Sequence, residues 1–170
     1  DKVVENASST TYNNYFQQKI RDRIGMNGFW FRGTGYNNVF YSNPRSMARF
    51  GLLMLNKGKW DQTSILSDSN YFNAQVNTSQ NYNLSYGYLT WLNGKATHML
   101  PQTQLVFNGN LIPTAPADLY AALGKNDQKV YVVPSQKLVV IRMGESAGNV
   151  QLAISSFDTE LWGKLKLVIG

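Results

Sequence analysis

The sequence of 170 residues contains no cysteine and a single histidine, His98. Without cysteine the chain can form neither a disulfide framework nor a thiolate metal site, and one histidine is too few for a typical zinc site. We therefore expect no metal and no cofactor. The lack of cysteine is compatible with the cytoplasm and with the periplasm.

Long apolar runs are also missing, since no stretch approaches the roughly 18 to 20 residues that would span a membrane. Positive charge is in moderate excess, with 16 basic and 10 acidic residues and a net charge of +6. Nucleic-acid binding would concentrate this charge on one face or strip. The basic residues fall instead in small groups near expected helix ends, where the helix dipole favours cations. The groups are Lys19-Arg21-Arg23, Lys57-Lys59 and Lys164-Lys166. We predict no transmembrane segment and no nucleic-acid partner.

The pair Ser-x-x-Lys, which sets a lysine base one helical turn from a serine nucleophile, occurs nowhere in the sequence. One stretch nevertheless looks nucleophilic. Gly144-Glu145-Ser146-Ala147-Gly148 follows an apolar run, as in the nucleophile elbow of α/β-hydrolases. That elbow needs a later histidine and a parallel sheet, whereas His98 lies upstream and the predicted strands are joined by short, antiparallel turns. We therefore interpret the stretch as a strand-to-helix turn and expect no complete hydrolytic site in this chain.

Apolar spacing and capping residues predict three longer helices. The first begins at Thr10 or Thr11 and ends at Gly25, and the second begins at Asn43-Pro44 and ends at Gly58. A closing amphipathic helix is expected from Val150 onward. Between these helices, the polar, Gly-rich residues 27–38 and the polar residues 61–84 are expected to be irregular apart from one short helix.

Five strands are expected between the second and the last helix. They are residues 86–92 and 95–100 around an Asn93-Gly94 hairpin turn, then residues 119–123, 130–133 and 138–141. Two helices, a run of antiparallel strands and a final helix make an α+β fold, with an antiparallel sheet flanked by helices. In the last hairpin, apolar side chains occur at successive positions and therefore on both faces of the strands. We expect both faces to be covered by other parts of the protein.

Four segments, in this order and spacing, resemble serine hydrolases related to class C β-lactamases and penicillin-binding proteins, in the branch of esterases and 6-aminohexanoate-dimer hydrolase. The segments are residues 20–26 (IRDRIGM), residues 41–51 (YSNPRSMARFG), residues 85–91 (SYGYLTW), and residues 121–124 with 128–134 and 138–140. The resemblance implies a β-lactamase/transpeptidase-like fold that is incomplete in this chain. Residues 1–170 would be the C-terminal part of one domain, and the nucleophilic Ser and its Lys and Tyr would lie upstream, outside it.

The family's Lys-Thr-Gly motif aligns with Ala122-Leu123-Gly124. The resemblance implies that Gly124 allows close approach of a substrate, and that the backbone N–H of Lys125 is an oxyanion-hole donor. An ordinary strand end with a turn glycine is the alternative from the residues alone. Because Lys and Thr are replaced by Ala122 and Leu123, a β-lactam carboxylate would lose its usual partners. An ester, amide or small peptide is the better substrate.

Further substrate-binding candidates are Tyr86, Tyr88, Trp91 and Gln128, each of which could equally serve packing. The expected function is a serine hydrolase that forms an acyl-enzyme with a nucleophile from outside this chain. A non-catalytic binding module of the same fold is the alternative, and an α/β-hydrolase proper is a third. The expected partners are a small-molecule substrate and a second chain carrying the N-terminal half. The family resemblance implies a periplasmic or secreted location.

Overall fold

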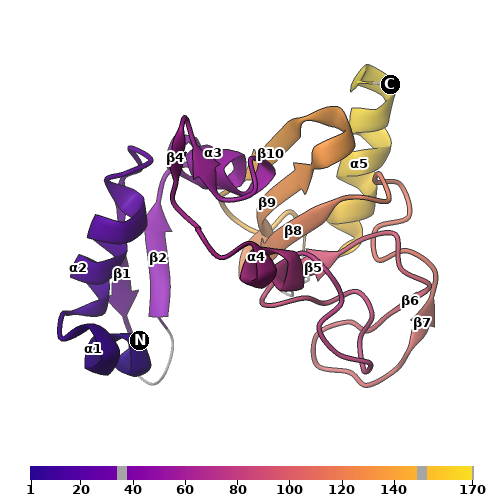
Figure 1. Ribbon diagram of the computed structural model, residues 1–170. Coiled ribbons are helices and arrows are strands. Elements are labelled where there is room, and N and C mark those ends of the chain that lie inside the picture. Colours follow the sequence, from indigo (N-terminus) through magenta and orange to yellow (C-terminus); the bar gives the residue numbers. More distant parts are fainter. Residues whose placement is uncertain (34–37, 149–152, 170) are drawn as a thin grey trace. The chain divides into compact units, whose positions relative to one another are not determined.

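The structure is a computed structural model that describes residues 1–33, 38–148 and 153–169. The chain forms two compact units, Asp1–Ser67 and Asp68–Gly170, and each has its own hydrophobic core (Figure 1). Both units combine helices with antiparallel strands, so the predicted α+β class is confirmed. None of the helices in the described ranges is long and apolar enough to cross a membrane.

The first unit holds three α-helices and two small hairpins. Its elements are α1 (Lys2–Ser8), α2 (Tyr12–Phe16) with a π-helical turn η1 (Gln17–Arg21), β1 (Gly28–Arg32), β2 (Asn38–Ser42), α3 (Pro44–Leu55), β3 (Lys59–Trp60) and β4 (Thr63–Ser64). The two predicted caps are confirmed. Thr11 accepts a hydrogen bond from the backbone N–H of Asn14, and Asn43 accepts one from Ser46 at 2.9 Å. These bonds satisfy N–H groups that a helix start leaves without a partner.

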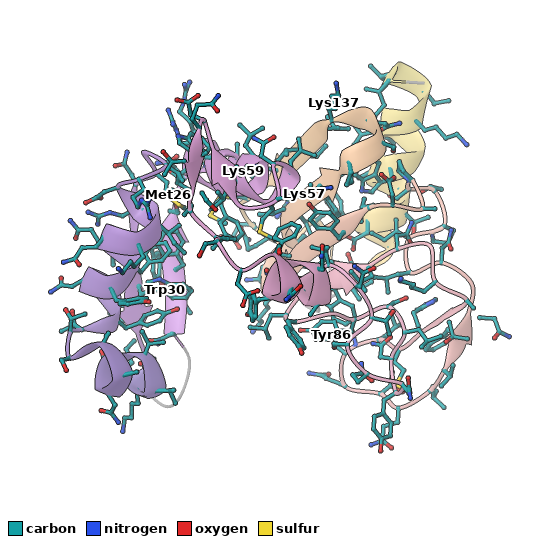
Figure 2. The ribbon with its side chains drawn as sticks, in the orientation of Figure 1. Met26, Trp30, Lys57, Lys59, Tyr86 and Lys137 are labelled. Carbon is teal, nitrogen blue, oxygen red and sulfur yellow. The ribbon has the colours of Figure 1, made fainter. Side chains whose placement is uncertain are left out.

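The stretch from Asn27 to Asn38, expected to be irregular, instead contributes β1 to an antiparallel hairpin with β2. Trp30, which Figure 2 labels, belongs to β1. Its ring packs edge-on against Phe16 of α2, with ring centroids 5.9 Å apart. Phe40 completes this cluster at 5.1 Å from Phe16. Phe29 and Phe31 on the outer face are about half exposed. Aromatic residues on both faces hide the alternation between apolar and polar residues by which a strand is recognised.

The second unit is built on one four-stranded antiparallel sheet in the order β10-β9-β8-β5. Its elements are α4 (Ser69–Gln75), β5 (Trp91–Leu92), β6 (Thr97–His98), β7 (Phe107–Asn108), β8 (Tyr120–Gly124), a 3-10 turn η2 (Lys125–Asp127), β9 (Gln128–Val133), η3 (Pro134–Gln136), β10 (Leu138–Arg142) and α5 (Ser156–Ile169). The three strands predicted for residues 119–141 are confirmed to within a few residues.

Helix α5 covers one face of this sheet, as Figure 1 shows. Trp162 of α5 meets Tyr131 of β9 edge-to-face at 5.5 Å, and both side chains are fully buried. Val133 and Ala121 extend the same core along β9 and β8. The closing helix is thus confirmed, and it begins at Ser156, whereas the predicted start at Val150 lies outside the described residues.

The Asn93-Gly94 hairpin prediction is wrong. β5 pairs with β8, and His98 in β6 pairs with Phe107 in β7. The reason is that the buried Asn93 side chain is used in a long-range contact. Its amide donates to the carbonyls of Ile112, Ala115 and Pro116 at 3.0–3.2 Å and accepts from the N–H of Ile112 at 3.0 Å. Asn93 therefore tethers a distant loop instead of turning a local hairpin.

Candidate functional site

Strand β8 carries three of the predicted site residues, Ala122, Leu123 and Gly124, and its two edges differ. Along one edge, β9 pairs with every residue from Tyr120 to Gly124. Along the other, β5 pairs only with Tyr120 and Ala121. Among the residues that the structure describes, no strand continues this pairing beside Ala122, Leu123 and Gly124. The second half of β8 therefore has an open edge, where backbone groups can bind an extended ligand.

Gly124 ends this open edge in an extended conformation, with φ −109° and ψ 167°, that any residue can adopt. A Cβ atom added there would lie 3.4 Å from the Cβ of Gln128, an ordinary van der Waals contact. Neither the backbone nor the packing in the described residues requires glycine at this position. What the glycine does is leave the end of the edge without a side chain.

The turn after Gly124, which we call the β8–β9 turn (Lys125–Asp127), has an unusual backbone. Asn126 and Asp127 both lie in the left-handed region, with φ of 57° and 56°. The N–H of Gln128 donates to the carbonyl of Lys125 and closes the turn. Left-handed geometry costs a non-glycine residue about 1–2 kcal/mol, and least for Asn and Asp. Other contacts must hold this turn in place.

The aromatic candidates form two ring pairs. Tyr86 packs edge-on against Trp91 at 4.7 Å, and burial raises the pKa of the Tyr86 hydroxyl. Tyr88 lies 5.6 Å from Tyr71 of α4 and is 45% exposed. Trp91 packs against the core under α5 and stands opposite Ala121 in register, so its side chain lies on the face of the sheet away from Ala122. Trp91 therefore contributes to packing.

The side chain of Gln128 bridges two turns. Its amide nitrogen donates to the carbonyl of Asn126 at 3.0 Å and also to the carbonyl of Gly144, and its oxygen accepts from the N–H of Gly144 at 3.1 Å. Arg142 makes a parallel link to the carbonyls of Asn126, at 3.0 Å, and Asp127, at 3.3 Å. Both polar ends of Gln128 are thus engaged within the protein.

Ser146 lies in what we call the serine turn (residues 144–148), directly after the edge strand β10. β10 pairs antiparallel with β9, which excludes the parallel sheet of a nucleophile elbow. The hydroxyl of Ser146 lies 3.5 Å from a carboxylate oxygen of Asp127, and the N–H of Ala147 donates to the same oxygen at 3.0 Å. His98 is engaged elsewhere: its Nδ1 lies 2.9 Å from the carbonyl of Gly109. The serine turn is a strand-to-helix connection, as predicted.

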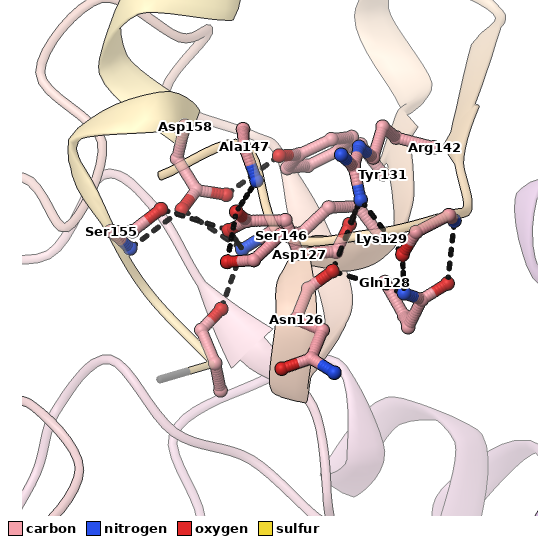
Figure 3. Close-up of polar contacts among 12 residues, drawn as sticks. Asn126, Asp127, Gln128, Lys129, Tyr131, Arg142, Ser146, Ala147, Ser155 and Asp158 are labelled. Carbon is pink, nitrogen blue, oxygen red and sulfur yellow. Dashed lines mark hydrogen bonds and ion pairs between the residues drawn. The ribbon is translucent and has the colours of Figure 1, made fainter. Parts of the chain in front are cut away.

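A buried ionic cluster lies beneath both turns (Figure 3). The ammonium of Lys129 lies 3.3 Å from Asp127 and 3.0 Å from Asp158 and donates to the carbonyl of Ala153 at 2.6 Å. Its side chain is fully buried, and both aspartates are 1% exposed. Tyr131 donates to Asp158 at 2.6 Å. The single lysine therefore bridges the β8–β9 turn to α5.

Two further donors complete the cluster. The hydroxyl of Ser155 donates to Asp127 at 2.8 Å, and its N–H donates to Asp158 at 2.9 Å. These bonds matter because a buried charge is tolerated only when its hydrogen-bonding groups are satisfied. Sequence reasoning missed this cluster. The available signal was the spacing of Asp127, Lys129 and Tyr131, which places charged groups on one face of an otherwise apolar strand.

The protonation states follow from these contacts. Burial alone would raise the pKa of Asp127. The hydrogen bonds from Ala147, Ser155 and Lys129, with the positive charge of Lys129, outweigh burial and hold the pKa below its usual value. Burial, followed by the negative charge of Asp158, raises the pKa of Tyr131. At neutral pH Asp127 is therefore a carboxylate and Tyr131 a neutral donor.

In residues 1–33, 38–148 and 153–169, no group of three His, Asp or Glu side chains is arranged to hold a metal ion. The Asp127–Lys129–Asp158 cluster contains only two carboxylates and is neutralised in part by its own lysine. The described residues thus bring together the end of β8, the turn that follows it and a buried ionic cluster that bonds to this turn.

Comparisons with known proteins identify the fold. No protein-family model matches the sequence, and no curated protein matches it. A solved structure from Bacteroides dorei, named as a β-lactamase by assignment, superposes with a TM-score of 0.63 at 12% identity, over 96% of this chain and 54% of that one. A protein from Bacillus anthracis, named by assignment as a 6-aminohexanoate-dimer hydrolase, gives a TM-score of 0.59 at 20% identity.

The second match covers 90% of this chain and 38% of the other. The chain thus spans about half the length of the first protein and less than half of the second. At such identities the likeness establishes the fold and not the activity. Over the part that it spans, this chain has a β-lactamase/transpeptidase-like fold.

Proposed function

We propose that this chain is part of a serine hydrolase that cleaves an ester, amide or small peptide-like substrate through an acyl-enzyme. The observation that carries the proposal is the open edge of β8, which ends at the bare backbone of Gly124 beside Lys125. In this role Ala122 and Leu123 flank the substrate, and the N–H of Lys125 donates to the oxyanion that forms during acylation.

The nucleophile in this proposal comes from outside the 170 residues. The sequence holds no Ser-x-x-Lys pair, and Ser146 lies beside a carboxylate with His98 bound elsewhere. A Ser, Lys and Tyr from the N-terminal half of the domain, in the same polypeptide or a second chain, supply nucleophile and base. The outer edge of β10 supports such an addition, because no described strand pairs with it and its apolar residues are half-buried.

The substrate class follows from two features. Ala122 and Leu123 offer neither a cation nor a hydroxyl to a β-lactam carboxylate, which favours substrates without that group. The name of the Bacillus anthracis protein refers to hydrolysis of a 6-aminohexanoate dimer, and we extend this class of small linear amide to the present chain. The proposed location, periplasmic or secreted, rests on the family resemblance.

A non-catalytic binding module of the same fold is the second candidate. The observation that favours it is the same replacement of the Lys-Thr pair by Ala122 and Leu123, since loss of polar residues at a reaction site is expected where catalysis has been lost. In that case the open edge of β8 would bind an extended ligand without cleaving it.

Labelling of the full-length protein with a fluorophosphonate probe, followed by peptide mapping, separates the candidates. The proposal predicts a label on one serine outside residues 1–170, and the same label in a Ser146→Ala variant. A label on Ser146 would overturn the proposal in favour of the elbow interpretation. A folded protein that takes no label, yet binds a small amide, would establish the binding module.

A further inference from the structure

The β8–β9 turn is held in its left-handed geometry from two sides. From below, the carboxylate of Asp127 accepts hydrogen bonds from Ala147 and Ser155 and pairs with Lys129 (Figure 3). From the side, Arg142 and Gln128 donate to the backbone carbonyl of Asn126, each at 3.0 Å. This three-residue turn is therefore held both through the side chain of Asp127 and through the backbone carbonyl of Asn126.

The side chain of Asp127 is buried, whereas its backbone is close to the open edge along the chain. Its side chain is 1% exposed and engaged by three partners, so it does not reach a ligand. Its backbone is two residues from Lys125, whose carbonyl closes the same turn by accepting from Gln128. The hydrogen bond from Gln128 to the Lys125 carbonyl therefore links the backbone that follows Asp127 to that of Lys125.

We propose that Asp127 is a positioning residue for the reaction, and that its anchored carboxylate holds the backbone N–H of Lys125 in the geometry that receives the oxyanion. This inference rests on the proposed function, in which Lys125 supplies that donor. The serine turn then acquires a role: the N–H of Ala147 is one of the groups that hold Asp127. Its contribution is indirect, through the β8–β9 turn.

The variants separate anchoring from general stability. Asp127→Gly accepts the left-handed backbone without strain but lacks the carboxylate. Asp127→Asn retains only one acceptor oxygen, whereas Ala147 and Ser155 bind different oxygens of the carboxylate, so it keeps one of these two anchoring bonds. Asp158→Asn is the matched control, because Asp158 contacts the same Lys129 but does not belong to the β8–β9 turn.

The experiment measures kcat and KM of the full-length protein on a small ester, with backbone hydrogen exchange at Gln128, whose N–H closes the β8–β9 turn by donating to the Lys125 carbonyl. An oxyanion donor acts mainly in the transition state, so its misplacement lowers kcat more than it raises KM. We expect Asp127→Gly to lower kcat about 10- to 100-fold with little change in KM. It should also accelerate exchange at Gln128 about tenfold, because the turn-closing hydrogen bond opens more often. Asp127→Asn, which keeps one anchoring oxygen, should lose less kcat than Asp127→Gly, and Asp158→Asn should retain kcat within about threefold even where it lowers stability more.

Two results would overturn the inference, and they differ from failure of the proposed function. Unchanged exchange at Gln128 in Asp127→Gly contradicts the anchor itself. Equal losses of kcat in Asp127→Gly and Asp158→Asn, in proportion to their losses of stability, contradict a positioning role. An inactive, unlabelled wild-type protein contradicts the proposed function and the catalytic part of the inference, whatever the exchange rates.

Discussion

Two turns lie at the same end of the sheet, and they contrast in what their sequences suggest. The sequence of the serine turn matches a familiar nucleophile motif. Its backbone N–H groups, however, donate hydrogen bonds to the side chains of Asp127 and Gln128. The sequence of the β8–β9 turn matches no known motif, yet this turn directly follows the open edge of β8. A motif indicates chemistry only when the sheet, the partners and the access that the chemistry needs are also present.

The two turns differ in what their backbone groups contact. Residues 144–148 meet the buried cluster through Ala147, so the backbone of the serine turn serves as a donor to Asp127. Lys125 is the first residue of the β8–β9 turn, and the second half of the strand before it has no described partner strand on one edge. Substitutions can test this division between a supporting turn and a site turn.

The largest effect is expected from Lys129→Met, because it leaves Asp127 and Asp158 buried without their common cation. Breaking a buried ion pair on one side typically lowers the free energy of unfolding by about 3–5 kcal/mol. Urea unfolding of the full-length protein measures this loss. The exposed Lys164→Met is the control and should change stability by less than about 0.5 kcal/mol. Equal effects in both variants would show that the cluster does not support the turns.

Gly124→Val should affect activity more than stability. The added Cβ makes ordinary contact with Gln128, and valine is favoured in an extended strand, so unfolding should change by less than about 1 kcal/mol. The side chain would obstruct the end of the open edge and lower kcat/KM about 100-fold, which equals about 2.7 kcal/mol. Steady-state kinetics on a small ester and thermal unfolding check the two halves of this prediction.

Gly144→Ala should show the reverse pattern. Gly144 has φ of 130°, a conformation that side chains rarely adopt, although a Cβ there would meet no atom within 4 Å. Backbone strain should therefore lower stability by about 1–2 kcal/mol, with activity per folded molecule retained. Gly148→Ala is the matched control, since a Cβ at Gly148 also meets no atom within 4 Å and its φ lies outside the left-handed range. It should be nearly neutral.

Acid should weaken the support of both turns. The pKa of Asp127 is lowered in the folded state, so its contribution to stability is complete above its unfolded value of about 3.9 and is lost as the pH falls through the folded value. We expect the free energy of unfolding to drop below about pH 4, and to drop less in Asp127→Asn. Urea titrations at pH 7, 4 and 3 measure the difference. Parallel curves for the two proteins would contradict it.

Ser146→Ala should have the smallest effect of all. In the proposed function the nucleophile lies outside residues 1–170, and the Ser146 hydroxyl lies 3.5 Å from the carboxylate of Asp127. The rate of ester hydrolysis per folded molecule should therefore change by less than about twofold. A loss of a hundredfold or more in that rate would restore Ser146 as the nucleophile.

Those parts of the fold that rest on local signals could be predicted from the sequence. Asn43-Pro44 determines the start of α3 by capping and a fixed φ, and two apolar runs around Pro134 specify the β9–β10 hairpin. The Asn93-Gly94 turn failed because Asn93 is bound by carbonyls about twenty residues further on, and no local pattern reports such a contact.

The candidate site was located by resemblance, at Gly124 and Lys125, and its supporting cluster was not foreseen. The link from Lys129 to Asp158 spans 29 residues and forms only when α5 packs on the sheet. The spacing of Asp127, Lys129 and Tyr131 indicates polar groups at one strand, but it does not identify the distant Asp158 as their partner. The placement of Trp91 under α5 could have been derived from strand alternation only after the pairing of β5 with β8 was known.

The rate at which the fluorophosphonate probe labels the full-length protein tests the contrast between the two turns most directly. Phosphonylation, like acylation, develops a negative oxygen that the oxyanion donors stabilise. The account predicts that Gly124→Val slows labelling about 100-fold while Gly144→Ala leaves it within about threefold, at a temperature where both variants are folded. Slow labelling in Gly144→Ala with an unchanged rate in Gly124→Val would contradict it.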